Sequence, residues 1–165
     1  MKNRTLGKIV LVFGLLLFLG NAVVAQHKYI GADKCKMCHN KPEKGEQYNK
    51  WVSDPHSKAF ASLKGDEATD PKCLKCHSTG GSIAANLNGG IKNTEGVSCE
   101  GCHGPGSTYK TLTIMKDHAK SLANGLIIPD EALCKKCHNS ESPHFKGFNY
   151  AEYLARIKHD DPTTN

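Results

Sequence analysis

The sequence predicts one mostly α-helical domain with extensive loops and little or no β structure. Apolar residues recur at helical spacing in several segments, whereas no segment alternates apolar and polar residues over the length of a strand. Glycine-rich and proline-containing stretches separate the helical segments. In addition, the pentapeptide Cys-x-x-Cys-His occurs four times and uses all eight cysteines. The chain is therefore organised around four repeated sites joined by short helices and loops.

Each expected helix has a start signal, a stop signal or an apolar stripe. A helix over 42–51 would begin at a proline, and one over 54–65 has an Asp-Pro start and a glycine stop. Leu112, Met115, Ala119 and Leu122 form the stripe of a helix over 111–124. Pro129 and Asp130 would start the helix that carries the fourth pentapeptide, and apolar residues at helical spacing from residue 150 to residue 157 predict a last helix that ends near residue 159. The stretch between the glycine pairs at 80–81 and 89–90 is expected to be a loop.

The repeated pentapeptide has the spacing that attaches c-type haem. Two thiols one short turn apart can bond to the two vinyl groups of one porphyrin, and the next imidazole reaches the iron. We therefore predict four covalently attached haem c groups. The copies are motif 1 (Cys35, Cys38 and His39), motif 2 (Cys73, Cys76 and His77), motif 3 (Cys99, Cys102 and His103) and motif 4 (Cys134, Cys137 and His138).

Paired cysteines also form zinc sites, redox dithiols and disulfides. Zinc ribbons place about 15–20 residues between their pairs, whereas 34 residues separate Cys38 from Cys73. None of these alternatives requires a histidine directly after each pair. Four copies that use every cysteine favour haem over all of them.

The N-terminus has the pattern of a secretory signal peptide. Three basic residues precede an apolar run from Ile9 to Leu19, and small residues follow up to Ala25. We expect cleavage after Ala25, which divides the chain into a signal peptide at 1–25 and a tetrahaem domain at 26–165. The apolar run is shorter than the about twenty residues that span a bilayer, so membrane attachment is expected only if the signal remains uncleaved. Export to the periplasm also agrees with covalent haem attachment.

Size and charge narrow the classes of function. Residues 26–165 provide little apolar material, with 11 aromatic residues in the whole chain, so we expect the haems to form the core. The net charge of +6 includes three basic residues of the signal peptide, and with the haem propionates the holoprotein is expected to be near neutral or slightly acidic. This charge gives no reason to expect nucleic-acid binding.

The second axial ligand of each iron decides what the haem can do. Two strong ligands leave the haem an electron carrier, whereas an open position can bind a substrate; histidine ligands imply low potentials. The candidates outside the motifs are His56 on an apolar helical face, His159 near the end of the last helix, His118 with Met115 as competitor, His144 between Pro143 and Phe145, and His27 in the polar N-terminal segment.

Three stretches resemble the tetrahaem cytochrome c-554 family, a group of multihaem c-type cytochromes. They are 29–35, the segment from Trp51 through His56 to Phe60, and above all the block from Gly96 to Ser107 around motif 3. The resemblance implies a small multihaem cytochrome c fold wrapped around four closely stacked haems, a periplasmic electron carrier, and His56 and His159 as distal ligands. It also implies that one haem lacks a sixth ligand. In some members a histidine closely follows the Gly-Pro-Gly-Ser block and binds a haem, whereas Thr108 and Tyr109 stand there here.

The leading prediction is an electron carrier, not an enzyme, that exchanges electrons with a donor protein and an acceptor protein. The first alternative is a small haem reductase or oxidoreductase that acts on nitrogen oxides or hydroxylamine at an open iron. The second is a subunit of a conductive cytochrome filament.

Overall fold

The computed structural model describes residues 26–162, so the predicted signal peptide lies outside the described residues. Helices and loops make up this part of the chain, and an isolated bridge between Tyr29 and Asn88 is its only β pairing. The predicted helical fold class is confirmed. The α-helices are α2 (Asp33–His39), α3 (Gln47–Ser53), α4 (Pro71–His77), α5 (Thr79–Ser82), α6 (Cys99–His103), α7 (Leu112–Met115), α8 (His118–Ala123), α9 (Glu131–Cys134) and α10 (Tyr150–Ile157). Short 3₁₀ helices lie between them: η1 (Pro42–Lys44), η2 (Pro55–Lys58), η3 (Phe60–Ser62), η4 (Gly65–Ala68), η5 (Ala85–Leu87) and η6 (Asn93–Glu95).

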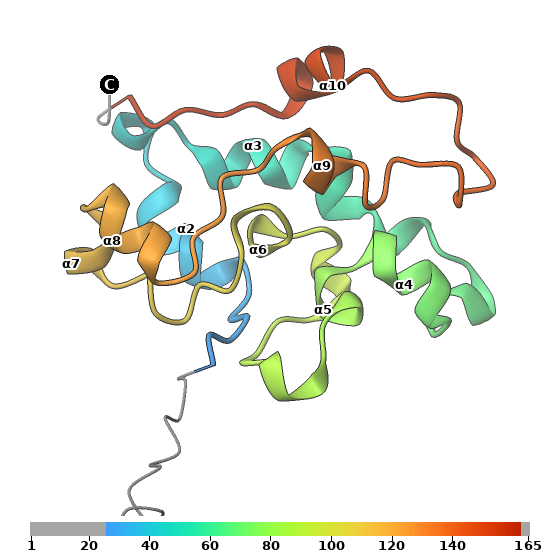
Figure 1. Ribbon diagram of the computed structural model, residues 1–165, viewed down its shortest axis with the longest axis horizontal. Helices are drawn as coiled ribbons and strands as arrows, with labels where there is room; N and C mark the ends of the chain where they lie inside the picture. The colour runs from blue at the N-terminus through green and yellow to red at the C-terminus, as the bar shows by residue number, and fades with distance from the viewer. Residues whose placement is uncertain (1–25, 163–165) are drawn as a thin grey trace, which may run out of the picture.

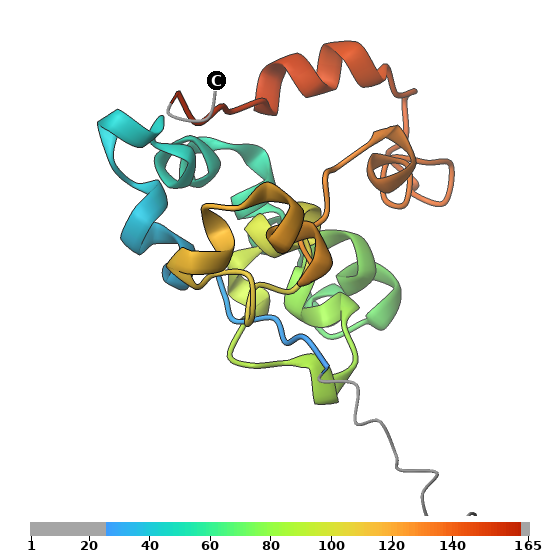
Figure 2. The same ribbon diagram turned by 60° about the vertical axis from the view of Figure 1, so that its left-hand side comes forward.

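The helices surround α6. Figures 1 and 2 place α2, α7 and α8 on one side of α6 and α4 and α5 on the other, while α10 crosses above α3. No helix among residues 26–162 is long and apolar enough to cross a membrane.

Aspartate caps explain why such short helices start where they do. The Asp54 carboxylate accepts the backbone N–H of His56 at 2.8 Å, which confirms the predicted cap. Asp70, Asp117 and Asp130 cap α4, α8 and α9 in the same way. An N-cap of this kind contributes about 1 kcal/mol to a helix, so local interactions set the start of α4, which carries motif 2, and of α9, which leads into motif 4.

Four predicted helices were wrong in extent. The helix expected to carry motif 4 ends at Cys134, the first residue of the motif. The helix expected over 42–51 is interrupted by Gly45 (φ 89°) and Glu46 (φ 52°), both left-handed, so η1 and α3 are separate. The helix expected over 54–65 consists of η2 and η3. The helix expected over 111–124 breaks before Asp117, which caps a new helix. The loop expected after motif 2 contains α5 and η5.

The apolar core of the described chain is very small. Only Ala32, Leu74, Ile91 and Tyr109 are buried hydrophobic residues among 26–162. Met37, Leu112 and Ile128 are more than half exposed, at 76%, 63% and 57%. Burial of apolar surface is the main stabilising term in folding, so side chains alone supply little of it here.

We expect the haem-free polypeptide to be unfolded. Production without haem attachment should give a chain whose far-ultraviolet circular dichroism shows little helix and no cooperative melting transition. The holoprotein, measured under the same conditions, is the control and should show both. A haem-free chain with the helical signal of the holoprotein would contradict this account of the core.

Candidate haem-attachment sites

Each motif lies on a helical turn that holds its thiols and imidazole together. Motifs 1, 2 and 3 form the C-terminal ends of α2, α4 and α6. Motif 4 begins at the last residue of α9 and continues as a turn, in which the His138 N–H donates to the Cys134 carbonyl at 3.0 Å. Residues three and four apart share one face of a helical turn. The paired cysteines and the following histidine of each motif therefore face the same way.

The cysteines are free thiols, and those of different motifs lie close to one another. A hydrogen bond with Cys35 and burial raise the pKa of the Cys99 thiol, which joins motif 1 to motif 3. Burial, with a smaller contribution from Cys134 of motif 4, raises the pKa of Cys102 to about 11. Burial and the nearby Cys76 of motif 2 raise the pKa of Cys137 to about 12. The motifs thus neighbour one another in the order 1–3–4–2.

Two motif histidines face a histidine from elsewhere in the chain. The ring centres of His138 and His56 are 6.0 Å apart, and so are those of His103 and His159. An imidazole nitrogen lies about 2.0–2.1 Å from a bound metal, so two imidazoles on opposite sides of one ion have centres roughly 6 Å apart. Both pairs have the separation that one iron between them requires.

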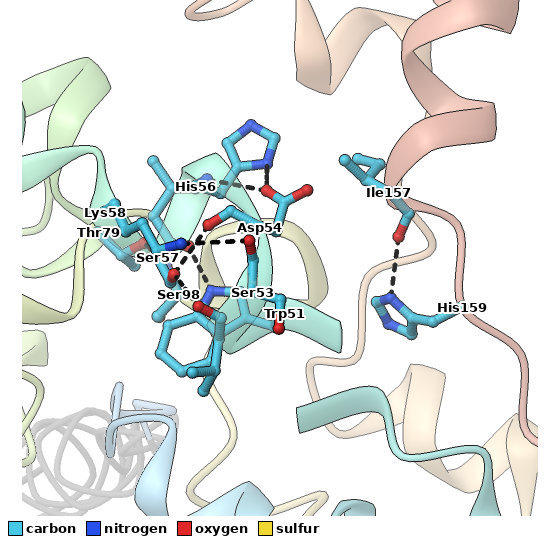
Figure 3. Close-up of polar contacts among 12 residues, drawn as sticks. Trp51, Ser53, Asp54, His56, Ser57, Lys58, Thr79, Ser98, Ile157 and His159 are labelled. Carbon is cyan, nitrogen blue, oxygen red and sulfur yellow. Dashed lines mark hydrogen bonds and ion pairs between the residues drawn. The ribbon is translucent and has the colours of Figure 1, made fainter. Parts of the chain in front are cut away.

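Hydrogen bonds at Nδ1 leave the outer nitrogen of these rings available. His77 Nδ1 lies 2.9 Å from the Ala59 carbonyl, and His103 Nδ1 lies 3.3 Å from that of Ile127. His159 Nδ1 lies 3.1 Å from the Ile157 carbonyl (Figure 3). A carbonyl can only accept, so each of these nitrogens carries the proton and Nε2 is left free as a metal ligand.

An acidic neighbour orients His56. Its Nδ1 lies 2.9 Å from Asp54 Oδ1, the same oxygen that caps η2 (Figure 3). Carboxylates commonly hold metal-binding imidazoles in this way. On the opposite ring of this pair, burial and the neighbouring His56 lower the pKa of His138. A lowered pKa keeps the imidazole neutral, the form that binds a metal.

Comparison with known proteins shows what this arrangement is similar to. The family model described as cytochrome c554 and c-prime matches residues 34–104. Cytochrome c-554 of Nitrosomonas europaea is 28% identical over 85% of this chain and 73% of that protein. The C-type polyheme cytochrome OmcC of Geobacter sulfurreducens is 32% identical over half of this chain and 12% of that protein. The solved reduced-state structure of the Nitrosomonas cytochrome has a TM-score of 0.54 at 23% identity, over 81% of this chain and 79% of that one.

The chain is similar to cytochromes of the c-554 family. This confirms the predicted resemblance, and with it covalently attached haem c as the type of cofactor. The residues present suit such a group, because the helical turns offer paired free thiols and the facing imidazoles have free outer nitrogens. The small apolar core agrees with cofactors that take up interior space.

The remaining candidate ligands of this cytochrome c-554 relative lie apart from the two histidine pairs. His118 is the first residue of α8 and is exposed. In Figure 1, α7 and α8 lie on the same side of α6 as α2, which carries motif 1. Met115, its competitor, ends α7. His144 lies in the exposed segment after motif 4. His27 is directed at Thr108, with Nδ1 2.9 Å from Oγ1.

Sequence reasoning missed several groups that support the site. The Phe148 ring stacks on His138 with centres 5.0 Å apart and planes at 18°, and Tyr153 contacts the same ring edge-on at 5.5 Å. The helical stripe of α10 signalled that Tyr153 is buried on one side but not what it touches. The carbonyls that hold the imidazoles leave no trace in the sequence, because every residue has one.

Glu100 was also missed, although it is a variable residue of motif 3. Its side chain is 1% exposed and lies against the segment that leads into motif 1. Both carboxylate oxygens accept backbone N–H groups, from Ile30 and Gly31 and from Gly106, at 2.7–3.0 Å. Burial raises its pKa, and these hydrogen bonds oppose that effect. Glu100 therefore fastens motif 3 to the entry of motif 1.

We expect Glu100→Ala to destabilise the holoprotein by about 3 kcal/mol or more, because buried N–H groups lose their acceptor. Glu100→Gln should also be destabilising, since both oxygens accept and an amide nitrogen cannot. Denaturant unfolding followed by circular dichroism measures both effects. Glu43→Ala is the control: this exposed carboxylate, 4.0 Å from Lys41, should change stability by less than about 0.5 kcal/mol. Equal effects at the two positions would contradict the role of Glu100.

Proposed function

We propose that this chain is an exported, periplasmic electron carrier in which residues 26–165 hold four c-type haems in a row. The observation that supports this proposal is that cysteines of neighbouring motifs shift one another's pKa in the order 1–3–4–2. Haem supplies an iron that gains and loses one electron without rearranging its surroundings. The chain's contribution is to hold neighbouring groups close together and to bring motifs 1 and 2 to the two ends of the row.

The axial histidines follow from the facing pairs. In this proposal His56 and His138 hold the iron of motif 4, and His159 and His103 hold that of motif 3. These two haems occupy the middle of the row, where two strong ligands and no open position suit electron transfer. For the motif 1 haem, His118 is the proposed partner of His39, because α8 lies on the same side of α6 as α2 in Figure 1.

Redox partners are proposed to dock at the ends of the row. Interfaces of electron-transfer proteins are small and weak, which permits rapid exchange. Motif 1 presents Lys34 and Lys36, both exposed, around its first thiol. This end suits an acidic partner surface, in line with the steering of encounters by opposite charge.

The enzymatic alternative requires an iron that small molecules can reach. A single electron injected into the oxidised holoprotein by pulse radiolysis should redistribute among the haems, and the ferrous protein should bind less than one carbon monoxide per chain. Catalytic turnover of nitrite or hydroxylamine by the purified protein would instead support the reductase. An electron that stays on one haem would contradict the proposed row of neighbouring haems.

His56→Ala and His159→Ala should each convert one low-spin iron into a high-spin iron. The reason is the loss of one of the two strong ligands in each facing pair. Electron paramagnetic resonance of the oxidised holoproteins counts both kinds of iron, and pyridine haemochrome analysis should still find four haems per chain.

His27→Ala is the matched control for these two variants. Its Nδ1 is bonded to Thr108 rather than facing a motif histidine, so the count of low-spin irons should stay that of the unmodified protein. A low-spin count unchanged in His56→Ala or His159→Ala would refute the corresponding assignment.

A further inference from the structure

Residues 139–149, between motif 4 and α10, form a loop of defined shape, the 139–149 loop. The Asn139 side chain donates to the Lys135 carbonyl at 2.9 Å and accepts the Glu141 N–H at 2.8 Å. Further turns follow, from the Ser142 N–H to the Asn139 carbonyl and from the Phe145 N–H to the Ser142 carbonyl. This geometry sets where His144 lies along the loop.

Two contacts tie the start of the loop to motif 2. The Glu141 carboxylate forms an ion pair with the ammonium group of Lys75, a variable residue of motif 2. The partnership raises the pKa of Lys75 and lowers that of Glu141. Directly before the loop, Cys137 Sγ lies 3.8 Å from the Lys75 carbonyl. Figures 1 and 2 both show the chain leaving α9 on the side of the molecule that holds α4.

Among the described residues, the ring of His77 in motif 2 is in neither of the two facing histidine pairs. His56 and His159 face motifs 4 and 3, and His118 is the proposed ligand for motif 1. His27 is bonded to Thr108 and packs against Gly125. His144, three residues beyond the Lys75–Glu141 ion pair, is the candidate ligand on a segment tied to motif 2.

We propose that His144 is the second axial ligand of the haem held by motif 2. The inference rests on the proposed four-haem carrier and adds to it the ligand of the terminal haem. His77 is positioned for such a partner, because its Nδ1 is held by the Ala59 carbonyl and the Ser62 hydroxyl and its Nε2 is free. His144 is exposed and bonded through its backbone N–H to Ser142, so its ring can turn toward an iron.

The 139–149 loop, which carries His144, is held to motif 2 by a weak contact. The Lys75–Glu141 pair that holds the loop is solvent-exposed, with side chains 48% and 65% accessible. Exposed ion pairs contribute little and are screened by salt. The motif 2 haem is thus the one whose second ligand an added small molecule displaces most readily, which places any ligand-dependent control of the carrier at this end.

The test compares holoproteins by electron paramagnetic resonance and by carbon monoxide titration of the ferrous state. His144→Ala should gain one high-spin iron and one tightly bound carbon monoxide per chain relative to the unmodified protein. In a Cys73→Ala/Cys76→Ala background, which lacks the motif 2 haem, adding His144→Ala should change neither count. A gain in that background would assign His144 to another haem and overturn the proposal.

A second variant tests the position of the loop without touching a ligand. Glu141→Ala should accelerate carbon monoxide binding several-fold, because it releases the loop from Lys75. Glu131→Ala is its matched control, since it removes a comparably exposed ion pair, with Lys135 at 2.7 Å, and should leave the rate unchanged. Equal rates of carbon monoxide binding in both variants would contradict the proposal that the Lys75–Glu141 ion pair holds the loop.

The outcomes separate this inference from the proposed function. Four haems per chain with one high-spin iron already present in the unmodified protein, and no change in His144→Ala, would overturn the ligand assignment alone. Fewer than four haems per chain, or haems that fail to exchange electrons, would overturn the four-haem carrier itself.

Discussion

The very small apolar core of the described chain is the constraint on which the rest of the structure depends. A chain that buries four apolar side chains among residues 26–162 lacks the apolar surface that normally offsets the entropy lost on folding. In the proposed holoprotein, paired thiols would attach each haem at two points, and an imidazole would add a third. The polypeptide needs only short helices, because each has to present one motif rather than to build a packed interface.

Backbone carbonyls orient the imidazole rings of these sites. The imidazoles of His77, His103 and His159 each meet a carbonyl through Nδ1, which fixes both the ring orientation and the nitrogen that is left for the metal. His56 meets a carboxylate instead. These carbonyls and the carboxylate come from different segments of the chain. Residues outside the motif helices therefore also determine the geometry of the sites.

The buried carboxylate of Glu100 holds motif 3 and the segment before motif 1 in place relative to one another. One side chain satisfies three backbone N–H groups from two segments distant in sequence. At the other end of the row, an exposed ion pair joins the 139–149 loop to motif 2. Motifs 3 and 1 are therefore held together by buried hydrogen bonds, whereas the 139–149 loop is held to motif 2 by a weaker, exposed contact.

The sequence by itself determined the haem attachment and the helical class, because both depend on local spacing: Cys35 to His39 or Cys99 to His103 can be recognised within five residues, and Asp54 marks a helix start within two. It also singled out His56 and His159. Local spacing could not determine which histidine faces which, since His56 and His138 are 82 positions apart, nor that Asp117 would divide the helix expected over 111–124. Long-range contacts, such as those of Cys35 with Cys99 and of Lys75 with Glu141, depend on how the whole chain closes. Only the tertiary structure decided the order of the motifs and the place of His144, because these are distances in space between residues whose separation along the chain carries no signal.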